Sequence, residues 1–231
     1  IFCSSFGLSL IPGKIGELIK PQLLKKNFDI PIKSTAPIVF VEQIYVLIGL
    51  VIISFLGIWL FDIGLIVISI FGGILVLLLI LIKSRKLFEK VFDYFSTKKF
   101  VGKYVEAFSV SYDVLQNATN RKTFVLITGL SILYWFIECL MVYLVFQSFG
   151  IDIEFLLVIP TYLSSILLGA ASFLPLGMGV VESSLAGFFS LIGIETSIAL
   201  TLVIVVRIFT RWISVAFGFI SLKFCGGYSL K

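Results

Sequence analysis

The stretch that decides the fold is Ile63-Gly-Leu-Ile-Val-Ile-Ser-Ile-Phe-Gly-Gly-Ile-Leu-Val-Leu-Leu-Leu-Ile-Leu-Ile82, 20 residues without a charged side chain. A helix needs about 20 apolar residues to cross the hydrocarbon core of a bilayer, which is about 30 Å thick. The chain as a whole is 59% hydrophobic and only 13% charged, whereas soluble domains are about 45–50% apolar and about 25% charged. The sequence therefore predicts an all-α, polytopic transmembrane helix bundle and excludes a soluble globular fold.

Apolar stretches that span a membrane, or nearly do, cover the whole chain. They run over about residues 37–61, 63–82, 124–149, 155–174 and 197–224, and a shorter apolar helix follows the fourth stretch over about residues 180–192. Asp62 and Gly64 predict a tight turn between the first two spans. We therefore expect one membrane domain over residues 1–231. Because the chain begins without Met and inside an apolar segment, we expect it to be N-terminally truncated, with further helices before residue 1.

The charged residues predict how the spans are oriented. Residues 83–122 alternate charged and apolar positions at helical spacing, which predicts a cytoplasmic amphipathic helical region on the membrane surface; a soluble helical hairpin packed on other loops is the alternative. Lys and Arg gather there and in loop 13–34, whereas the turns near Asp62, Asp152 and Glu195 hold neither. The positive-inside rule places both basic loops in the cytoplasm of a multi-pass cell-membrane protein. The net charge of +5 then reflects topology, and we expect no nucleic-acid partner.

The segment after Asp152 must enter the membrane and return to the same side before Glu195. Its turning point, residues 173–181, contains Pro and Gly and has no basic residue to hold it in cytoplasmic water. Irregular backbone inside a membrane is tolerated only where it is buried in protein or lines a wet cavity. We therefore predict a broken or re-entrant hairpin, with its tip within the membrane as a functional candidate.

The tip has a counterpart near the start of the chain. Residues 9–17 and 172–182 both have Ser three positions before Pro, an aliphatic residue directly before Pro, Gly four positions after it and a Glu shortly beyond. Each copy is followed, at nearly the same separation, by a span that carries a charged residue, Glu42 or Arg207. The charge argument makes the copies enter from opposite sides, which predicts an inverted repeat of the kind found in transporters. Coincidence between two short Gly/Pro turns is the alternative.

These turns and the charges inside the spans supply the candidate binding residues. A helix that restarts after a Pro-Gly turn exposes unpaired N–H groups and a positive dipole end, which bind anions such as phosphate. Each charge within hydrocarbon costs at least about 2.5–3.5 kcal/mol and seldom persists without a partner or a role. The substrate-binding candidates are Pro12, Gly13, Gly16, Glu17, Glu42, Glu138, Pro175, Gly177, Gly179, Glu182, Arg207 and Arg211.

Two readings of these charges stay open at the level of sequence. Arg207 and Arg211 are four residues apart on one helix face, and two adjacent guanidinium groups suit a phosphate or a pair of carboxylates. In the first reading the arginines and the glutamates of the spans line a polar path. In the second they form ion pairs that lock the bundle and touch no substrate. For Arg211 alone, next to Trp212, a position at the membrane interface with its charged end reaching toward water is a further alternative.

The amino-acid composition gives little support for an enzyme. The chain contains no histidine, which removes the usual general base at neutral pH and the Ser/His and Cys/His nucleophile pairs. Cys3, Cys139 and Cys225 are far apart and indicate neither a disulfide framework nor a zinc site. We therefore expect no enzyme activity, no cofactor and no metal ion. We expect the tryptophans to face lipid or to anchor the chain at the membrane interface, at Trp59, Trp135 and Trp212.

Five segments, in this order, resemble a known family. They are Leu10-Ile-Pro-Gly-Lys-Ile-Gly-Glu-Leu18, Val41-Glu-Gln-Ile44, Trp135-Phe-Ile-Glu138, Leu174-Pro-Leu-Gly-Met-Gly-Val-Val-Glu182 and Arg207-Ile-Phe-Thr-Arg-Trp212. Over nearly its whole length the chain resembles the lysylphosphatidylglycerol synthase transmembrane region, also called the flippase-like domain family. In multidomain members, this region is credited with flipping an aminoacylated phospholipid, while a separate soluble domain performs the aminoacyl transfer. Other members resemble proteins implicated in the handling of polyprenyl-linked sugars.

The chain departs from the family pattern in several places. The first helices of the family domain are missing, and there is no room for the soluble synthase domain, so lysyl transfer is not carried over. Lys14 stands where the family usually shows Arg, and Leu176 stands where it usually shows a second Gly. These departures loosen any assignment of a particular substrate.

The sequence leaves three hypotheses for function. The first is a translocase for a phospholipid or a polyprenyl-linked lipid, and membrane lipids are its expected partners. The second is a non-catalytic partner or regulator of a lipid-modifying enzyme or glycosyltransferase, with residues 83–122 as the docking surface. The third, a membrane-embedded lipid transferase, is disfavoured because the chain has no histidine and no DxD-like acidic pair. A separate lipid-modifying enzyme and further copies of the chain are the protein partners considered.

Overall fold

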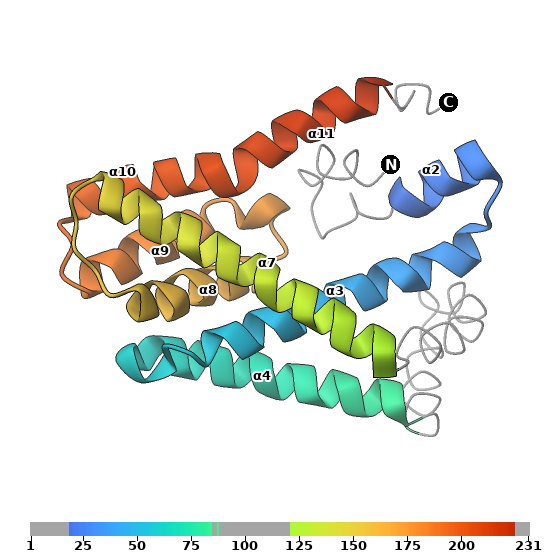
Figure 1. The fold of residues 1–231 in the computed structure, drawn as a ribbon, viewed down its shortest axis with the longest axis horizontal. Coiled ribbons are helices and arrows are strands. Elements are labelled where there is room, and N and C mark those ends of the chain that lie inside the picture. The colour runs from blue at the N-terminus through green and yellow to red at the C-terminus, as the bar shows by residue number, and fades with distance from the viewer. Residues whose placement is uncertain (1–18, 85–86, 88–120, 225–231) are drawn as a thin grey trace.

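A computed structural model describes residues 19–84, Leu87 and 121–224, which form helices joined by short turns and contain no strand (Figure 1). The elements are α2 (Ile19–Phe28), α3 (Ile32–Ser54), η2 (Ile58–Leu60), α4 (Asp62–Lys83), α7 (Arg121–Ser148), α8 (Phe155–Ala171), η3 (Pro175–Gly177), α9 (Val180–Leu191), α10 (Thr196–Arg207), η4 (Ile208–Trp212) and α11 (Ile213–Phe224). The predicted all-α fold is confirmed. Residues 9–17, with the first Pro-Gly turn, and nearly all of the predicted amphipathic region 83–122 lie outside the described residues.

Three stretches of helix are long and apolar enough to cross a membrane: Asp62–Ile80, Lys122–Ser148 and Thr196–Ser221. Shorter apolar helices stand beside them, so the described chain forms a multi-pass bundle. The outer faces of these helices carry large apolar side chains. On α4, for example, Ile66 and Leu77 are exposed while Ile68 is buried in the core. Such a surface suits hydrocarbon, in which apolar side chains are favourable.

The turn between the first two predicted spans lies earlier than expected. Helix α3 ends at Ser54, and the turn is made by residues 55–61, so Asp62 already stands in the first turn of α4. The reason is a close backbone approach, because a Cβ atom on Gly57 would lie 1.8 Å from the carbonyl oxygen of Leu156 at the start of α8. Only glycine fits this contact, and it fixes where the chain reverses. The prediction of a turn at Asp62 and Gly64 was therefore wrong by several residues.

Two further expectations are corrected within the bundle. Part of the predicted loop 13–34 is the helix α2, which packs on α3. Trp135 does not face lipid, because it is buried and its indole Nε1–H donates to the carbonyl oxygen of Val46, 2.8 Å away. This bond ties α7 to α3. Trp59 and Trp212 are exposed, as predicted.

Helices α8 and α9 form the predicted broken hairpin. Both open ends of the hairpin lie at the end of the bundle where α7 turns into α8, and its tip stops part-way along the long axis (Figure 1). At the tip, Leu176 and Gly177 have positive φ angles of 52° and 66°. A Cβ on Gly177 would come 2.9 Å from the Cα of Gly169, so the tip turn η3 packs closely on the backbone of α8. The predicted depth of this tip in a membrane stays a prediction.

The last predicted span, residues 197–224, is one long helix interrupted by a π turn, η4. Buried positions on α10 recur at the spacing of an α-helix, at Ala199, Leu202, Val203 and Val206. Thr210 within the π turn is also buried, but the next buried side chain is Val215, five residues later. The π turn therefore inserts one extra residue between the buried faces of α10 and α11.

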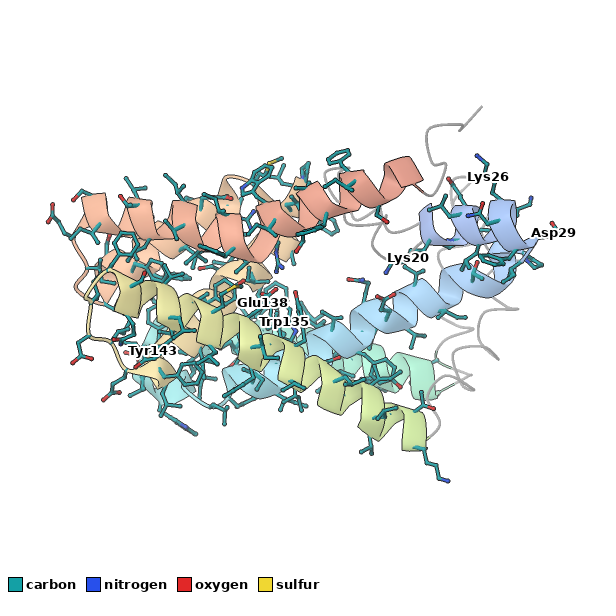
Figure 2. All side chains as sticks on the ribbon, turned by 45° about the horizontal axis from the view of Figure 1, so that its top comes forward. Lys20, Lys26, Asp29, Trp135, Glu138 and Tyr143 are labelled. Atoms are coloured by element: carbon teal, nitrogen blue, oxygen red, sulfur yellow. The ribbon has the colours of Figure 1, made fainter. Side chains whose placement is uncertain are left out.

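The acidic turns gather at one end of the bundle. The α3–α4, α7–α8 and α9–α10 connections all lie at the left in Figure 1, whereas α2 lies at the opposite end. Figure 2 places Lys26 of α2 at that opposite end. The described spans thus alternate as the charge argument requires, and which end faces the cytoplasm stays a prediction.

Candidate functional site

Arg207 lies at the C-terminal end of α10 and is buried, with 2% of its surface exposed. Its Nε–H donates to Oε1 of Glu182 at 2.6 Å, and its Nη2 donates to the carbonyl oxygen of Leu176 at 2.8 Å. The guanidinium therefore joins α10 to both sides of the start of α9. We call Arg207, Glu182 and residues 175–179 the tip cluster.

Glu182 completes the tip cluster from the first turn of α9. Its second carboxylate oxygen, Oε2, accepts the backbone N–H of Gly179 at 2.6 Å. A carboxylate at this position is favoured because the N-terminus of a helix carries a partial positive charge. One third of the Glu182 side chain stays exposed, so the cluster is accessible from the carboxylate side. The predicted candidates Pro175, Gly177, Gly179, Glu182 and Arg207 are thus brought together.

One side-chain atom of the tip cluster has no partner. The Nη1 atom of Arg207 is buried and makes no hydrogen bond within the described part of the chain. A buried donor on a charged group that finds no acceptor is costly, because the group has lost its water without replacement. Such atoms are rare in folded proteins and ask for an explanation.

A second polar cluster surrounds Glu138, which lies inside the bundle on α7 (Figure 2). Arg211 donates to it through Nη1 at 2.8 Å and Nη2 at 3.4 Å. The hydroxyl of Tyr162 donates to Oε2 at 2.8 Å, and the hydroxyl of Tyr134 donates to Oε1. We call these four residues the Glu138 cluster; they link α7, α8 and the π turn.

Sequence reasoning missed both tyrosines of the Glu138 cluster. Tyr134 stands four residues before Glu138 on the same helix, so the i, i+4 spacing was a usable signal. Tyr162 lies on α8 and reaches Glu138 only through the packing of α7 against α8, so no pattern in the sequence indicates it.

The two arginines do not share one ligand in this structure. Arg207 pairs with Glu182 of α9, and Arg211 pairs with Glu138 of α7. Two carboxylates are present, as one of the sequence alternatives predicted, but each arginine forms an ion pair with a carboxylate from a different helix. The two clusters lie one helical turn apart along α10 and η4, and π turns are frequent at functional sites.

Glu42 forms a third ion pair at some distance along the chain. Both of its carboxylate oxygens lie 2.9 Å from Nζ of Lys20, which projects from α2. Lys20 was expected in a loop and missed as a partner. The remaining candidates, Pro12, Gly13, Gly16 and Glu17, lie outside the described residues.

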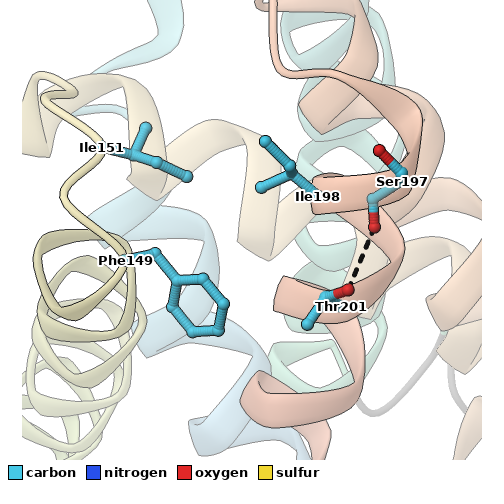
Figure 3. Close-up of a pocket in the computed structure, with 5 residues that line it drawn as sticks. All are labelled: Phe149, Ile151, Ser197, Ile198 and Thr201. Carbon is cyan, nitrogen blue, oxygen red and sulfur yellow. Dashed lines mark hydrogen bonds between the residues drawn. The ribbon is translucent and has the colours of Figure 1, made fainter.

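A cavity of about 360 Å³ lies elsewhere, between the end of α7 and the start of α10 (Figure 3). It is lined by Phe149, Ile151, Ser197, Ile198 and Thr201. The hydroxyl of Thr201 is already engaged, since it donates to the carbonyl oxygen of Ser197 at 3.0 Å. None of the candidate binding residues lines this cavity, so it is separate from both clusters.

The described part of the chain shows no cluster of metal ligands. No three His, Cys, Asp or Glu side chains come together there as metal ligands. Cys139 is buried next to Glu138 in the sequence and is not in a disulfide.

The geometry, with charged pairs set into apolar helices, agrees with what similarity to known proteins shows. The family described as Lysylphosphatidylglycerol synthase TM region matches residues 1–218. The chain belongs to this family. A UPF0104 membrane protein of Methanocaldococcus jannaschii is 30% identical over 217 residues, which cover 91% of this chain and 90% of that relative.

Two further relatives match this chain over shorter segments. One UPF0104 membrane protein of Methanothermobacter thermautotrophicus is 43% identical over 89 residues, 38% of this chain and 27% of the relative. Another from the same organism is 32% identical over 104 residues, 44% of this chain and 31% of the relative. No solved structure matches the chain. The similarity therefore shows that the chain belongs to a family of membrane proteins whose description refers to the synthesis of a lipid.

Proposed function

We propose that this chain is a translocase that moves a polar-headed membrane lipid, a phospholipid or a polyprenyl-linked lipid, between leaflets. The observation that carries the proposal is the tip cluster. A buried arginine pairs with a partly exposed glutamate at the broken tip of a hairpin that stops part-way along the bundle. Charge of this kind within apolar helices is expensive, and it marks substrate paths in membrane proteins.

The arrangement of the two clusters suits the movement of a headgroup. A lipid headgroup cannot cross hydrocarbon cheaply, because its polar groups lose their hydrogen bonds to water. The tip cluster and the Glu138 cluster offer charged groups on consecutive turns of one long helix. About a third of the Glu182 side chain and 21% of the Arg211 side chain remain exposed. A headgroup would exchange partners between these groups while its tails stay in lipid.

The ion pairs themselves also fit the alternative in which they only lock the bundle. In that case, neutralising one pair without leaving a lone charge is harmless to activity if the fold survives. In a translocase, the same change removes groups that the headgroup needs. The two readings therefore predict different rates of lipid translocation for a variant in which one ion pair is neutralised.

The test is lipid translocation in liposomes that contain the purified chain. A fluorescent phospholipid is placed in both leaflets, and dithionite quenches the outer leaflet, so movement appears as loss beyond half of the signal. We expect the wild type to accelerate this loss, and Arg207→Ala to abolish the acceleration. Thr201→Val, on α10 but outside both clusters, is the matched control and should behave as wild type.

Folding must be checked for each variant by circular dichroism and gel filtration, because Arg207→Ala leaves Glu182 without its cation. The doubly neutral variant Glu182→Gln with Arg207→Gln avoids the lone charge. Wild-type translocation in this folded double variant refutes the proposal. So does a wild type that moves neither the fluorescent phospholipid nor, in the same assay, a fluorescent polyprenyl-linked lipid.

A further inference from the structure

We infer that the tip cluster binds a phosphate oxygen, held by Nη1 of Arg207 together with the free N–H groups at the start of α9. This inference rests on the proposed function and deepens it. It names the phosphate, the group that phospholipids and polyprenyl-phosphate lipids share, as the recognised part of the headgroup.

The first argument is the unfilled donor on Arg207. A guanidinium has five N–H donors in one plane. Nε and Nη2 are occupied by Glu182 and by the carbonyl oxygen of Leu176, but Nη1 has no acceptor. The side chain is held on two sides, so it cannot turn to find one without breaking those bonds. Nη1 of Arg207 can therefore donate a hydrogen bond to one further oxygen atom.

The second argument is the start of α9, a helix of 12 residues. Its first intrahelical backbone bond is donated by Ser183 to the carbonyl oxygen of Gly179 at 3.0 Å. The N–H groups of Val180, Val181 and Glu182 come before this bond and have no intrahelical acceptor. Gly179 stands at the N-cap position and has no side chain to accept from them. The Glu182 carboxylate caps only Gly179 itself.

The third argument is charge. Arg207 and Glu182 cancel, which leaves the partial positive charge of the helix end, equivalent to about half an elementary charge. Such a site suits a group with one negative charge and more than one free oxygen. A phosphodiester has this form, with one oxygen for Nη1 and another for the helix N–H groups, and arginine matches phosphate geometry well.

The covering of Nη1 sets a condition on entry. Because this atom is buried in the structure, the lipid reaches it only after side chains over the tip cluster move aside. Gly179 at the N-cap position of α9 is exposed, whereas Glu182 is only partly exposed. We expect the phosphate to enter on the Gly179 side, because the Glu182 carboxylate repels an anion.

Binding can be tested directly in nanodiscs made of a phosphate-free glycolipid. Calorimetry measures the affinity of the full chain for dihexanoyl-phosphatidylglycerol, for a short-chain diacylglycerol glucoside without phosphate, and for inorganic phosphate as a competitor. The variant Arg207→Lys keeps the charge opposite Glu182 but has no Nη1. We expect it to bind the phospholipid about tenfold more weakly or worse, since hydrogen bonds to charged groups are the strong ones. Thr201→Val should bind as the wild type does.

A folded double variant, Glu182→Gln with Arg207→Gln, separates binding from packing, because it retains a neutral hydrogen-bonding pair. Loss of phospholipid binding in this variant supports the site. Competition by inorganic phosphate shows that the phosphate suffices, and its absence with phospholipid binding intact shows that the lipid body is needed as well; both support a phosphate site. Equal affinity for the glucoside and the phospholipid, or unchanged binding in Arg207→Lys, overturns the inference.

The liposome assay keeps this inference distinct from the proposed function. Translocation of both phospholipid and glucoside at equal rates, unaffected by Arg207→Lys, leaves the translocase and removes the phosphate site. Binding that depends on Arg207 without any translocation leaves the site and removes the translocase.

Discussion

Glycines in and near the α8–α9 hairpin should differ in how well they tolerate an added methyl group. At Gly177, φ is 66°, and a Cβ would lie 2.7 Å from a methyl of Val181 and 2.9 Å from the Cα of Gly169. A left-handed backbone costs a residue with a Cβ about 1–2 kcal/mol. Overpacking against backbone adds about 1–3 kcal/mol. We therefore expect Gly177→Ala to lower the free energy of unfolding by about 2–5 kcal/mol.

Two matched variants separate these contributions. Gly150 has nearly the same φ, 69°, but a Cβ there would meet nothing within 4 Å. Gly150→Ala should therefore show the backbone strain alone, about 1–2 kcal/mol. Gly187 lies inside α9 at an ordinary φ with open space around it, so Gly187→Ala should raise stability by about 0.5–1 kcal/mol.

The assay is SDS titration of each purified variant in mixed micelles, with helix content followed by circular dichroism. The difference between Gly177→Ala and Gly150→Ala isolates the contact at the hairpin tip. If the two variants are equally destabilised, the tip turn does not pack against Gly169 of α8, and the reasoning about the tip is refuted.

The remaining predictions concern the bundle around the two clusters, and the same titration checks them. Glu138→Ala should cost about 3–5 kcal/mol because it strands a partly buried cation, whereas Tyr162→Phe should cost only about 0.5–1.5 kcal/mol; equal losses would contradict the ion pair. Trp135→Phe should cost about 0.5–1.5 kcal/mol through its lost hydrogen bond, and no loss would mean that the indole is unbonded. Gly57→Ala should cost about 3 kcal/mol or more, and wild-type stability would refute the close approach to Leu156.

The sequence predicted the helices well because their signal is local. Twenty apolar residues specify a span without reference to any other part of the chain, so residues 63–82 were placed within one residue of α4. The hairpin was also predictable, because Pro175 and Gly179 interrupt an apolar run wherever it folds. The charged candidates were found for the same reason, since each stands alone among apolar neighbours.

The errors arose where the structure depends on contacts between distant segments. Gly57 determines the α3–α4 turn only because Leu156, far along the chain, lies against it. The choice of Glu182 for Arg207 and Glu138 for Arg211 depends on which helices pack together. Trp135 was misplaced because its hydrogen bond crosses from α7 to α3. Local patterns carry no information on such pairings.

The π turn at residues 208–212 has a consequence for engineering the C-terminal helix. One residue of an α-helix corresponds to a rotation of about 100°. Because the π turn already absorbs one extra residue, deleting a single residue between Thr210 and Val215 would restore an unbroken α-helix without rotating α11. Val215 would then follow Thr210 by four residues and keep its buried position. A deletion in this stretch should thus be far less harmful than a deletion within α10, which would turn every later residue by that angle.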